Sequence, residues 1–401
     1  MSSMRRLLLR GGHAPSTSAL RRFSTAPRLA RGDGCRALQV GETYHNFVLQ
    51  RATAVPEYNI EALELEHART KARYVHIDAK DPNNVFSVMF RTPPASSNGI
   101  AHILEHTTLC GSRQFPVRDP FFNMIKRSLN TYMNALTAYD HTMYPFSTVN
   151  EKDLKNLRAV YLDAVFFPNL RRLDFLQEGH RLEIVDTKDG ELELQYKGVV
   201  YNEMKGVMSD ANNLFATKVQ QALMEGTIYG HVSGGDPAAI PDLTYEELKA
   251  FHAKHYHPSN ACFFSYGDMS LTDHLQYLDE EILSKFEYRG DSAAVRVDNE
   301  TPLDISKTPK DSKLIVVDGP TSNMNAGAAG ASEEGDVATP ERDPNMKFCT
   351  AKFLPMSSTD PFETFVMRIV AYLLTNGPSS ELYKALIDSG TRTGLRCWHG
   401  L

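Results

Sequence analysis

The stretch GIAHILEHTTLCGS, residues 99–112, decides the fold and raises the question of function. The segment before it, PPASSNG, combines prolines with small polar residues, which is typical of a chain break followed by a helix start. Gly111 is well placed to end that helix, because glycine readily adopts the backbone conformation found just past helix ends. We therefore predict a short helix over residues 100–109 that carries the sequence His-Ile-Leu-Glu-His.

Two histidines four residues apart on a helix lie one above the other on the same face. His102 and His106 can therefore both bind one metal ion, and Glu105 can reach a water on that ion without displacing a ligand. This order is the inverted form of the HExxH zinc-protease motif, in which the glutamate is the general base. The alternative is two surface histidines beside an ordinary glutamate, because short motifs recur by chance.

A catalytic zinc site also needs a third protein ligand and one open position for water. Two glutamates compete for that role. Glu183 lies in HRLEIV, a predicted strand, and Glu203 lies in GVVYNEMKG, at the predicted start of a long helix. A carboxylate at a helix start is held rigidly, which favours Glu203 slightly, but the residues alone leave the choice open.

The remaining pattern mixes strands and helices. Residues 44–90 are strand-like, EKDLKNLRAVYLDAVFF has helical spacing, and HRLEIV with ELELQY predicts a hairpin. A further segment, DLTYEELKAFHAKHYHPSNACFFSYGD, predicts a helix, a turn and a strand. This mixed order with hairpins predicts the α+β class, with a mixed or antiparallel sheet packed with helices.

Composition limits the classes of protein that this chain can be. Its 401 residues suffice for two domains, and 42% hydrophobic with 23% charged residues is ordinary for a globular protein. No apolar run approaches the length that crosses a bilayer, so we predict no stable membrane insertion. Five scattered cysteines without CxxC spacing argue against a disulfide scaffold.

The first 32 residues contain seven arginines and no acidic residue. This composition predicts a mitochondrial transit peptide over residues 1–32 and a location in the mitochondrial matrix, with a disordered basic tail as the alternative. Without those seven arginines, 36 basic and 49 acidic residues remain, a net charge of −13. An acidic protein repels nucleic acid and attracts basic peptides, so we predict no nucleic-acid partner.

A second histidine-rich segment, FHAKHYHPSNA, raises the possibility of another metal site at His252, His255 and His257. No acidic residue or cysteine accompanies these histidines, and Pro258 follows at once. We therefore predict that they belong to the scaffold.

Several long blocks, in this order along the chain, resemble the presequence protease family of mitochondria and plastids, which is part of the pitrilysin–insulysin superfamily. The resemblance covers residues 43–390 apart from residues 320–345. The blocks are GIAHILEHTTLCGS, RDPFFNMIKRSLNTYMNALTAYDHTMYPFST, LDFLQEGHRLE, YKGVVYNEMKG, SGGDPAAIPDLTYEELKAFHAKHYHPSNA and LYKALIDSG.

The resemblance implies one Zn²⁺ per chain, held by His102, His106 and Glu203, with Glu105 as the general base for zinc-bound water. It implies an ATP-independent metalloendopeptidase that degrades cleaved targeting presequences and other short unstructured peptides in mitochondria. Glu183 would then be a structural residue of its strand.

The resemblance also implies where the peptide binds. In the superfamily a peptide adds as a strand beside an edge strand near the zinc, and that strand corresponds to MNALTA in this sequence. Asn134 and Ala135 fall at the positions that hold the substrate backbone. Strand addition reads backbone more than side chains, which suits an enzyme that degrades varied peptides.

By the same resemblance, residues 43–290 form the pitrilysin-like zinc metallopeptidase domain and residues 291–345 a linker or insertion. Residues 346–401 then begin a second homologous domain that is incomplete, so this chain could be inactive alone. The family is usually monomeric, and a dimer is also compatible.

Two alternative functions belong to other classes of protein. One is the catalytic subunit of a processing-peptidase-like heterodimer, which would take its missing half from a partner chain. The other is a non-catalytic structural relative, against which the four intact site residues argue.

Overall fold

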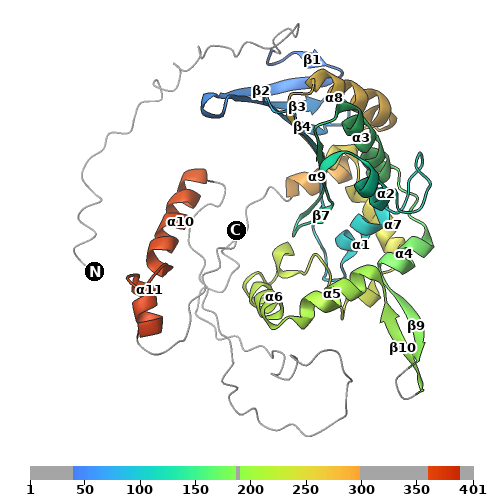
Figure 1. The fold of residues 1–401 in the computed structure, drawn as a ribbon, viewed down its shortest axis with the longest axis vertical. Helices are drawn as coiled ribbons and strands as arrows, with labels where there is room; N and C mark the ends of the chain where they lie inside the picture. Colours follow the sequence, from blue (N-terminus) through green and yellow to red (C-terminus); the bar gives the residue numbers. More distant parts are fainter. Residues whose placement is uncertain (1–38, 187–189, 299–359, 389–401) are drawn as a thin grey trace.

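The computed structural model describes residues 39–186, 190–298 and 360–388 (Figure 1). The predicted transit peptide over residues 1–32 lies outside these ranges, as do residues 299–345 of the predicted linker. The domain boundaries expected from the sequence therefore remain a prediction.

One large sheet organises the described part of the chain. Its strand order is β1-β2-β3-β4-β11-β5-β8-β6, and the short strand β7 pairs with β8 beside β6. The strands are β1 (Thr43–Tyr44), β2 (Phe47–Val55), β3 (Ile60–His67), β4 (Arg73–Asp78), β5 (Asn84–Arg91), β6 (Asn130–Met133), β7 (Leu136–Thr137), β8 (His141–Thr148) and β11 (Ala261–Gly267).

The strands form because apolar residues alternate with more polar ones, so that one face of the sheet is buried. Along β5 and β11, buried residues alternate with half-buried ones at every second position. Phe86, Phe146 and Phe263 are fully buried on that face. β11 runs parallel to β4 and antiparallel to β5, so the sheet is mixed, as the sequence predicts.

Helices cover the sheet on its buried side (Figure 1). α1 contacts β7 and β8, and α3 contacts β5 and β8. The α-helices are α1 (Ile100–Thr108), α2 (Pro120–Arg127), α3 (Glu151–Phe166), α4 (Arg172–Glu178), α5 (Val199–Ser209), α6 (Ala211–Leu223), α7 (Tyr245–His255), α8 (Leu271–Tyr277), α9 (Gly290–Asp298), α10 (Pro361–Thr375) and α11 (Glu381–Tyr383). Short helical turns are η3 (Pro56–Tyr58), η4 (Ile228–Gly230), η5 (Ile240–Asp242), η6 (Pro258–Asn260), η7 (Leu278–Ile282), η8 (Leu283–Lys285) and η11 (Lys384–Asp388).

The predicted hairpin and the predicted long helix are both present. β9 (Arg181–Asp186) pairs antiparallel with β10 (Leu192–Lys197) as a separate two-stranded sheet. The long helix divides into α5 and α6 at Asp210, whose side chain accepts hydrogen bonds from the backbone N–H groups of Asn212 and Asn213 and so caps α6. The predicted α+β class, a mixed sheet packed with helices, is confirmed.

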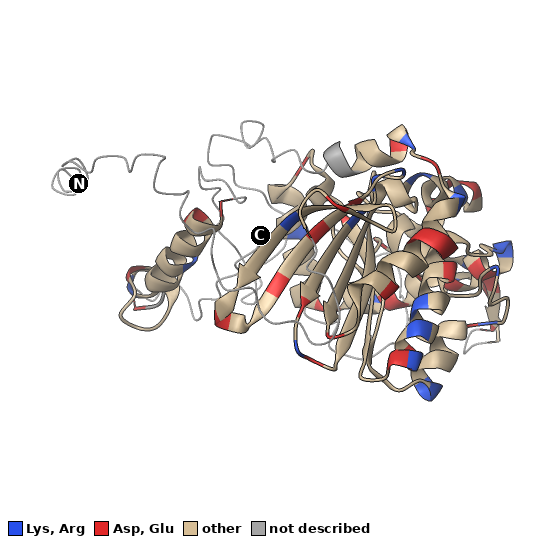
Figure 2. Ribbon diagram, turned by 90° about the horizontal axis from the view of Figure 1, so that it is seen from above, with Lys and Arg blue, Asp and Glu red and all other residues tan. Residues whose placement is uncertain are grey.

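Charged residues of both signs are spread over the helices (Figure 2). In the residues that the structure describes, no helix has both the length and the apolar content needed to cross a membrane. α9 begins at Gly290 and therefore extends into the segment expected to be a linker.

Candidate metal centre and active site

The two histidines of the opening motif lie on α1, as their spacing predicts. α1 buries Ile103 and Leu104 completely, which leaves His102 and His106 on its less buried side. Their ring centroids are 5.0 Å apart. The packing of this short amphipathic helix therefore presents both imidazoles to the same space.

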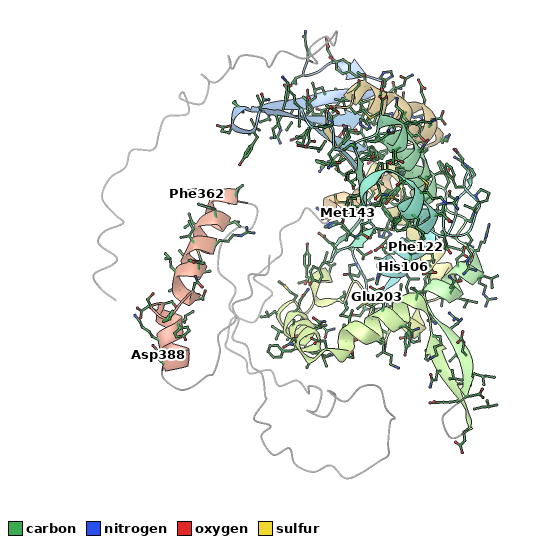
Figure 3. All side chains as sticks on the ribbon, viewed as in Figure 1. His106, Phe122, Met143, Glu203, Phe362 and Asp388 are labelled. Atoms are coloured by element: carbon green, nitrogen blue, oxygen red, sulfur yellow. The ribbon has the colours of Figure 1, made fainter. Side chains whose placement is uncertain are left out.

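Glu203, on α5, lies near His106 (Figure 3). Its Oε2 atom lies 3.8 Å from Nε2 of His102 and 3.8 Å from Nε2 of His106. One ligand atom from each of the three residues lies within 4.8 Å of the others, and in the described part of the chain this is the one such group of metal-ligating side chains found. Glu183, the rival candidate, instead binds Arg181, with 2.7 Å from the arginine Nε to Oε1.

This donor set fits a zinc ion. Two imidazole nitrogens and one carboxylate oxygen are a ligand set of catalytic zinc sites, with bonds of about 2.0–2.2 Å. Tetrahedral ligands at that distance lie about 3.4 Å from one another. The two 3.8 Å separations are close to this value. About half of the Glu203 side chain is exposed, so solvent reaches the group.

Both imidazole rings form a hydrogen bond through Nδ1. Nδ1 of His102 is 2.9 Å from the carbonyl oxygen of Gly234, and Nδ1 of His106 is 3.1 Å from Oε2 of Glu178. Because a carbonyl or carboxylate oxygen only accepts, each Nδ1 carries the proton and donates it. In the neutral ring each Nε2 is then free of hydrogen and can present its lone pair to a metal ion.

The charges around His106 favour its protonated form when no ion is present. Burial disfavours the imidazolium, but the hydrogen bond that His106 donates to Glu178 and the negative charges of Glu105, Glu178 and Glu203 together raise the pKa of His106 above its ordinary value. Burial likewise opposes the ionised form of Glu178, yet its hydrogen bonds with His106 and Gln177 lower its pKa below the ordinary value. The carboxylates around His106 therefore favour positive charge at this position.

Glu105 is buried on α1, with 8% of its surface exposed. Its Oε2 atom accepts a hydrogen bond of 2.7 Å from Oγ1 of Thr137, on strand β7. This bond fixes the carboxylate beside the histidines and ties it to the edge of the sheet.

A cavity of about 420 Å³ opens over the group. Its wall joins the three metal-ligating candidates and Glu105 to the sheet edge and to the segment around Gly234. The lining residues are His102, Glu105, His106, Asn134, Ala135, Leu136, Thr137, Glu203, Met204 and Gly234.

Asn134 and Ala135 both line this cavity, but they lie between β6 and β7 and belong to neither strand. The backbone N–H of Asn134 donates to the carbonyl of Pro145 on β8, and its own carbonyl accepts from the Tyr161 hydroxyl. β6 and β7 form the outer edge of the sheet beyond β8. The segment expected to hold a peptide is thus at an edge that borders the cavity.

Glycines allow close packing between the segments that carry the site residues. A Cβ atom on Gly99, whose φ is +70°, would lie 3.0 Å from Cα of Gly235, so the glycine lets α1 start against the segment that holds His102. A Cβ atom on Gly198, just before α5, would overlap the carbonyl oxygen of Gly179. The end of α4 and the start of α5 therefore touch through bare backbone, which brings Glu178 and Glu203 to the same centre.

The second histidine-rich segment does not form a metal group in the described residues. Nε2 of His252 bonds the carbonyl of Val165, and Nδ1 of His255 bonds the carbonyl of Phe251. Nδ1 of His257 accepts from the backbone N–H of Ser259. These three separate backbone contacts agree with the scaffold role expected from the sequence.

Three participants were not anticipated from the sequence: Thr137, Glu178 and Gly234. Thr137 lies inside MNALTA and Glu178 inside LDFLQEGHRLE, but nothing in their spacing relates them to His102 or His106. Their roles follow only from the contacts described above.

Two family profiles match this chain. The profile of "Insulinase (Peptidase family M16)" matches residues 91–189, and that of "Peptidase M16 inactive domain" matches residues 242–398. Together they cover more than half of the chain. His102, Glu105 and His106 fall in the first range, and Glu203 falls between the two.

Curated relatives named "Presequence protease, mitochondrial" are similar over most of this chain. The one from Danio rerio is 49% identical over 349 residues, which is 87% of this chain and 32% of the relative. Those from Mus musculus and Schizosaccharomyces pombe are 48% and 46% identical over 89% of this chain, and over 32% and 34% of their own length. The chain thus spans about a third of the length of these relatives.

Among solved structures, pitrilysin superposes on 60% of this chain and 24% of its own, with a TM-score of 0.47 and 17% identity. The two family profiles and the long similarity to presequence proteases establish the family. The chain belongs to peptidase family M16, and within it is similar to the presequence proteases.

Proposed function

We propose that this chain carries the catalytic site of a zinc metalloendopeptidase that hydrolyses short unstructured peptides, cleaved targeting presequences among them. The observation that carries the proposal is the convergence of His102, His106 and Glu203 on one point, with Glu105 beside them. The names of the similar relatives supply the substrate class.

One Zn²⁺ would be held by Nε2 of each histidine and by the carboxylate of Glu203. When bound, the ion supplies Lewis acidity, which makes a water more acidic and polarises a scissile carbonyl. The protein contributes the rest: the Nδ1 contacts with Gly234 and Glu178 fix both rings before any ion arrives.

Glu105 is the proposed general base. Thr137 donates to its Oε2, and the carboxylate would take the proton of the attacking water and pass it to the leaving amine. The bond to Thr137 holds the carboxylate in position, so little reorganisation is needed during the reaction.

The peptide would lie along the outer edge of the sheet, at β7 and the segment with Asn134 and Ala135. An extended peptide adds backbone hydrogen bonds to such an edge with little demand on side-chain identity. Because Thr137 is on β7 and bonds Glu105, a peptide aligned with this edge would pass in front of the base.

The site of action we propose is the mitochondrial matrix. The support is the arginine-rich, acid-free stretch over residues 1–32 and the word "mitochondrial" in the names of the similar relatives. We further propose that the reaction needs no ATP and that residues 43–290, 291–345 and 346–401 are the metallopeptidase domain, a linker and the start of a second domain.

Substitution of Glu105 by Gln tests the mechanism. Glu105→Gln is expected to keep one zinc per chain, because it alters no ligand, and to lower turnover of an unstructured peptide by roughly 10²–10⁴-fold, because the base is lost. Zinc is measured by inductively coupled plasma mass spectrometry and cleavage by peptide mapping.

Two further variants complete that experiment. His102→Ala is expected to lose both zinc and turnover, and Glu183→Gln, which removes the rival carboxylate, is expected to keep both. Normal turnover in Glu105→Gln would refute its assignment as the base. A chain that binds zinc but cleaves only with an added partner chain would instead favour the heterodimer reading.

A further inference from the structure

Glu178 lies next to the candidate metal centre, in contact with His106. It is the last residue of α4 and exposes only 8% of its surface. The next residue is Gly179, where a Cβ atom would lie 2.8 Å from the carbonyl oxygen of Phe175 and 3.1 Å from Cγ2 of Ile103 on α1. Glycine at this position therefore lets the end of α4 close onto α1, and the Glu178 carboxylate points at His106.

Both carboxylate oxygens of Glu178 are engaged. Oε2 accepts from Nδ1 of His106 at 3.1 Å, and Oε1 accepts from Nε2 of Gln177 at 2.9 Å. The Gln177 Oε1 atom in turn accepts from Arg118 at 2.7 Å, so the arginine reaches the carboxylate only through the amide. A buried carboxylate needs hydrogen-bond partners and a compensating charge.

In the residues that the structure describes, the one ion pair found for Glu178 is the pair with His106. Its negative charge is therefore balanced on the side of the metal centre, through His106, and not by a lysine or arginine in contact with it. His102 differs, because its Nδ1 bonds the neutral carbonyl of Gly234. The two histidines thus have different Nδ1 partners: the charged carboxylate of Glu178 for His106 and a neutral carbonyl for His102.

We propose that Glu178 is a positioning residue that raises the affinity of this centre for Zn²⁺. It rests on the proposed metal site and acts through His106 without touching the ion. The hydrogen bond holds the ring so that Nε2 faces Glu203, and the carboxylate makes the imidazole a better donor to a cation. Loss of such an outer contact typically weakens metal binding by about 10- to 100-fold.

The test is zinc affinity, which requires no peptidase activity. Zinc is titrated against a chromogenic chelator at fixed pH into the unsubstituted full chain and into Glu178→Gln and Glu178→Ala. The amide of Glu178→Gln can still accept from Nδ1 but has no charge, so we expect zinc affinity to fall in the order unsubstituted, Glu178→Gln, Glu178→Ala. The alanine variant should lose about 10- to 100-fold.

Two additional measurements separate positioning from loss of structure. The Co²⁺ derivative should show a shifted visible absorption band in both Glu178 variants, because a reoriented imidazole alters the ligand field. Thermal melts of the metal-free proteins detect any general destabilisation, and Glu183→Gln, which removes a carboxylate from the adjacent strand, should bind zinc as the unsubstituted chain does.

Glu178→Gln is the deciding variant because it keeps the shape of the side chain. Zinc affinity within twofold of the unsubstituted chain in this variant would overturn the proposal, whatever the alanine variant does. Failure of the unsubstituted chain itself to bind zinc would refute the proposed function, a result that is distinct from equal binding by all three proteins.

Discussion

At the scale of single residues, spacing predicts one part of the site and leaves the other part open. The four-residue interval between His102 and His106 is enough to put both rings on one side of α1, since it reflects only the helical repeat. The choice between Glu183 and Glu203 depends on which chain segments meet. Glu203 lies 3.8 Å from both Nε2 atoms, whereas Glu183 is paired with Arg181 on the hairpin.

Gly198 tests how far the site depends on a close backbone approach. Gly198→Ala is expected to destabilise the protein by about 1–3 kcal/mol, because a Cβ atom there overlaps the carbonyl of Gly179 and must push α5 away from α4. Zinc affinity should fall as well, because Glu203 moves with α5. Urea unfolding and chelator titration measure the two effects.

Gly206 provides a matched control on the same helix. A Cβ atom at Gly206 meets nothing within 4 Å, so Gly206→Ala should leave zinc affinity unchanged and stabilise α5 by about 0.5–1 kcal/mol through helix propensity. Equal behaviour of the two alanine variants would show that the approach at Gly198 is not required.

At the scale of elements, periodicity predicts which helices and strands form better than it predicts where they are interrupted. α1, α3 and the β9–β10 hairpin all occur where the pattern predicts them. The expected strand in MNALTA is interrupted at Asn134 and Ala135, and the expected long helix is divided at Asp210. The division at Asp210 follows from its side chain, which caps α6 through local hydrogen bonds that an apolar pattern does not report.

The half-buried His252 on α7 predicts a dependence of stability on pH. Burial lowers the pKa of His252 from 6.5 to about 4. Between about pH 6.5 and 4 the unfolded chain therefore binds a proton that the folded chain does not, so the free energy of unfolding decreases as the pH falls through this window. The loss reaches up to about 3 kcal/mol for a shift of this size.

Urea unfolding of the metal-free chain at several pH values checks this expectation. His252→Gln removes the titrating group, and its amide can still donate to the carbonyl of Val165, so its stability should decline less between pH 6.5 and 4. His45→Asn, which removes an exposed imidazole in a turn, is the control. Parallel pH curves for His252→Gln and the unsubstituted chain would show that this histidine is not held neutral.

At the scale of the whole molecule, the apolar surface is unevenly covered. The sheet and its helices bury a continuous core that includes Tyr74, Phe86 and Phe263. α10 differs, because it buries none of its residues and its large apolar side chains are exposed. These are Phe362, Phe365, Val366, Ile369, Val370, Tyr372, Leu373 and Leu374. Exposed apolar surface of this extent promotes association.

We expect the chain to self-associate in solution through α10. Phe365→Glu combined with Leu373→Glu should reduce the average mass in multi-angle light scattering, because two charges on the apolar surface oppose its burial. Thr364→Glu adds a charge to the same helix without removing an apolar side chain and should have little effect. A monodisperse monomer of the unsubstituted chain at high concentration would contradict this expectation.

The sequence alone determined the class of fold, the helix with His102 and His106, the identity of Glu105 as the candidate base and the resemblance to the family. These follow from short-range regularities: a repeat of 3.6 residues, an alternation of two, and motifs whose members are neighbours in the chain. The tertiary structure decided the rest. Glu203 on α5 and Glu178 on α4 reach the histidines, and Thr137 on β7 reaches Glu105, because sheet register and two glycine contacts between backbones bring those elements together. No local pattern encodes such distances, since each depends on how whole elements pack.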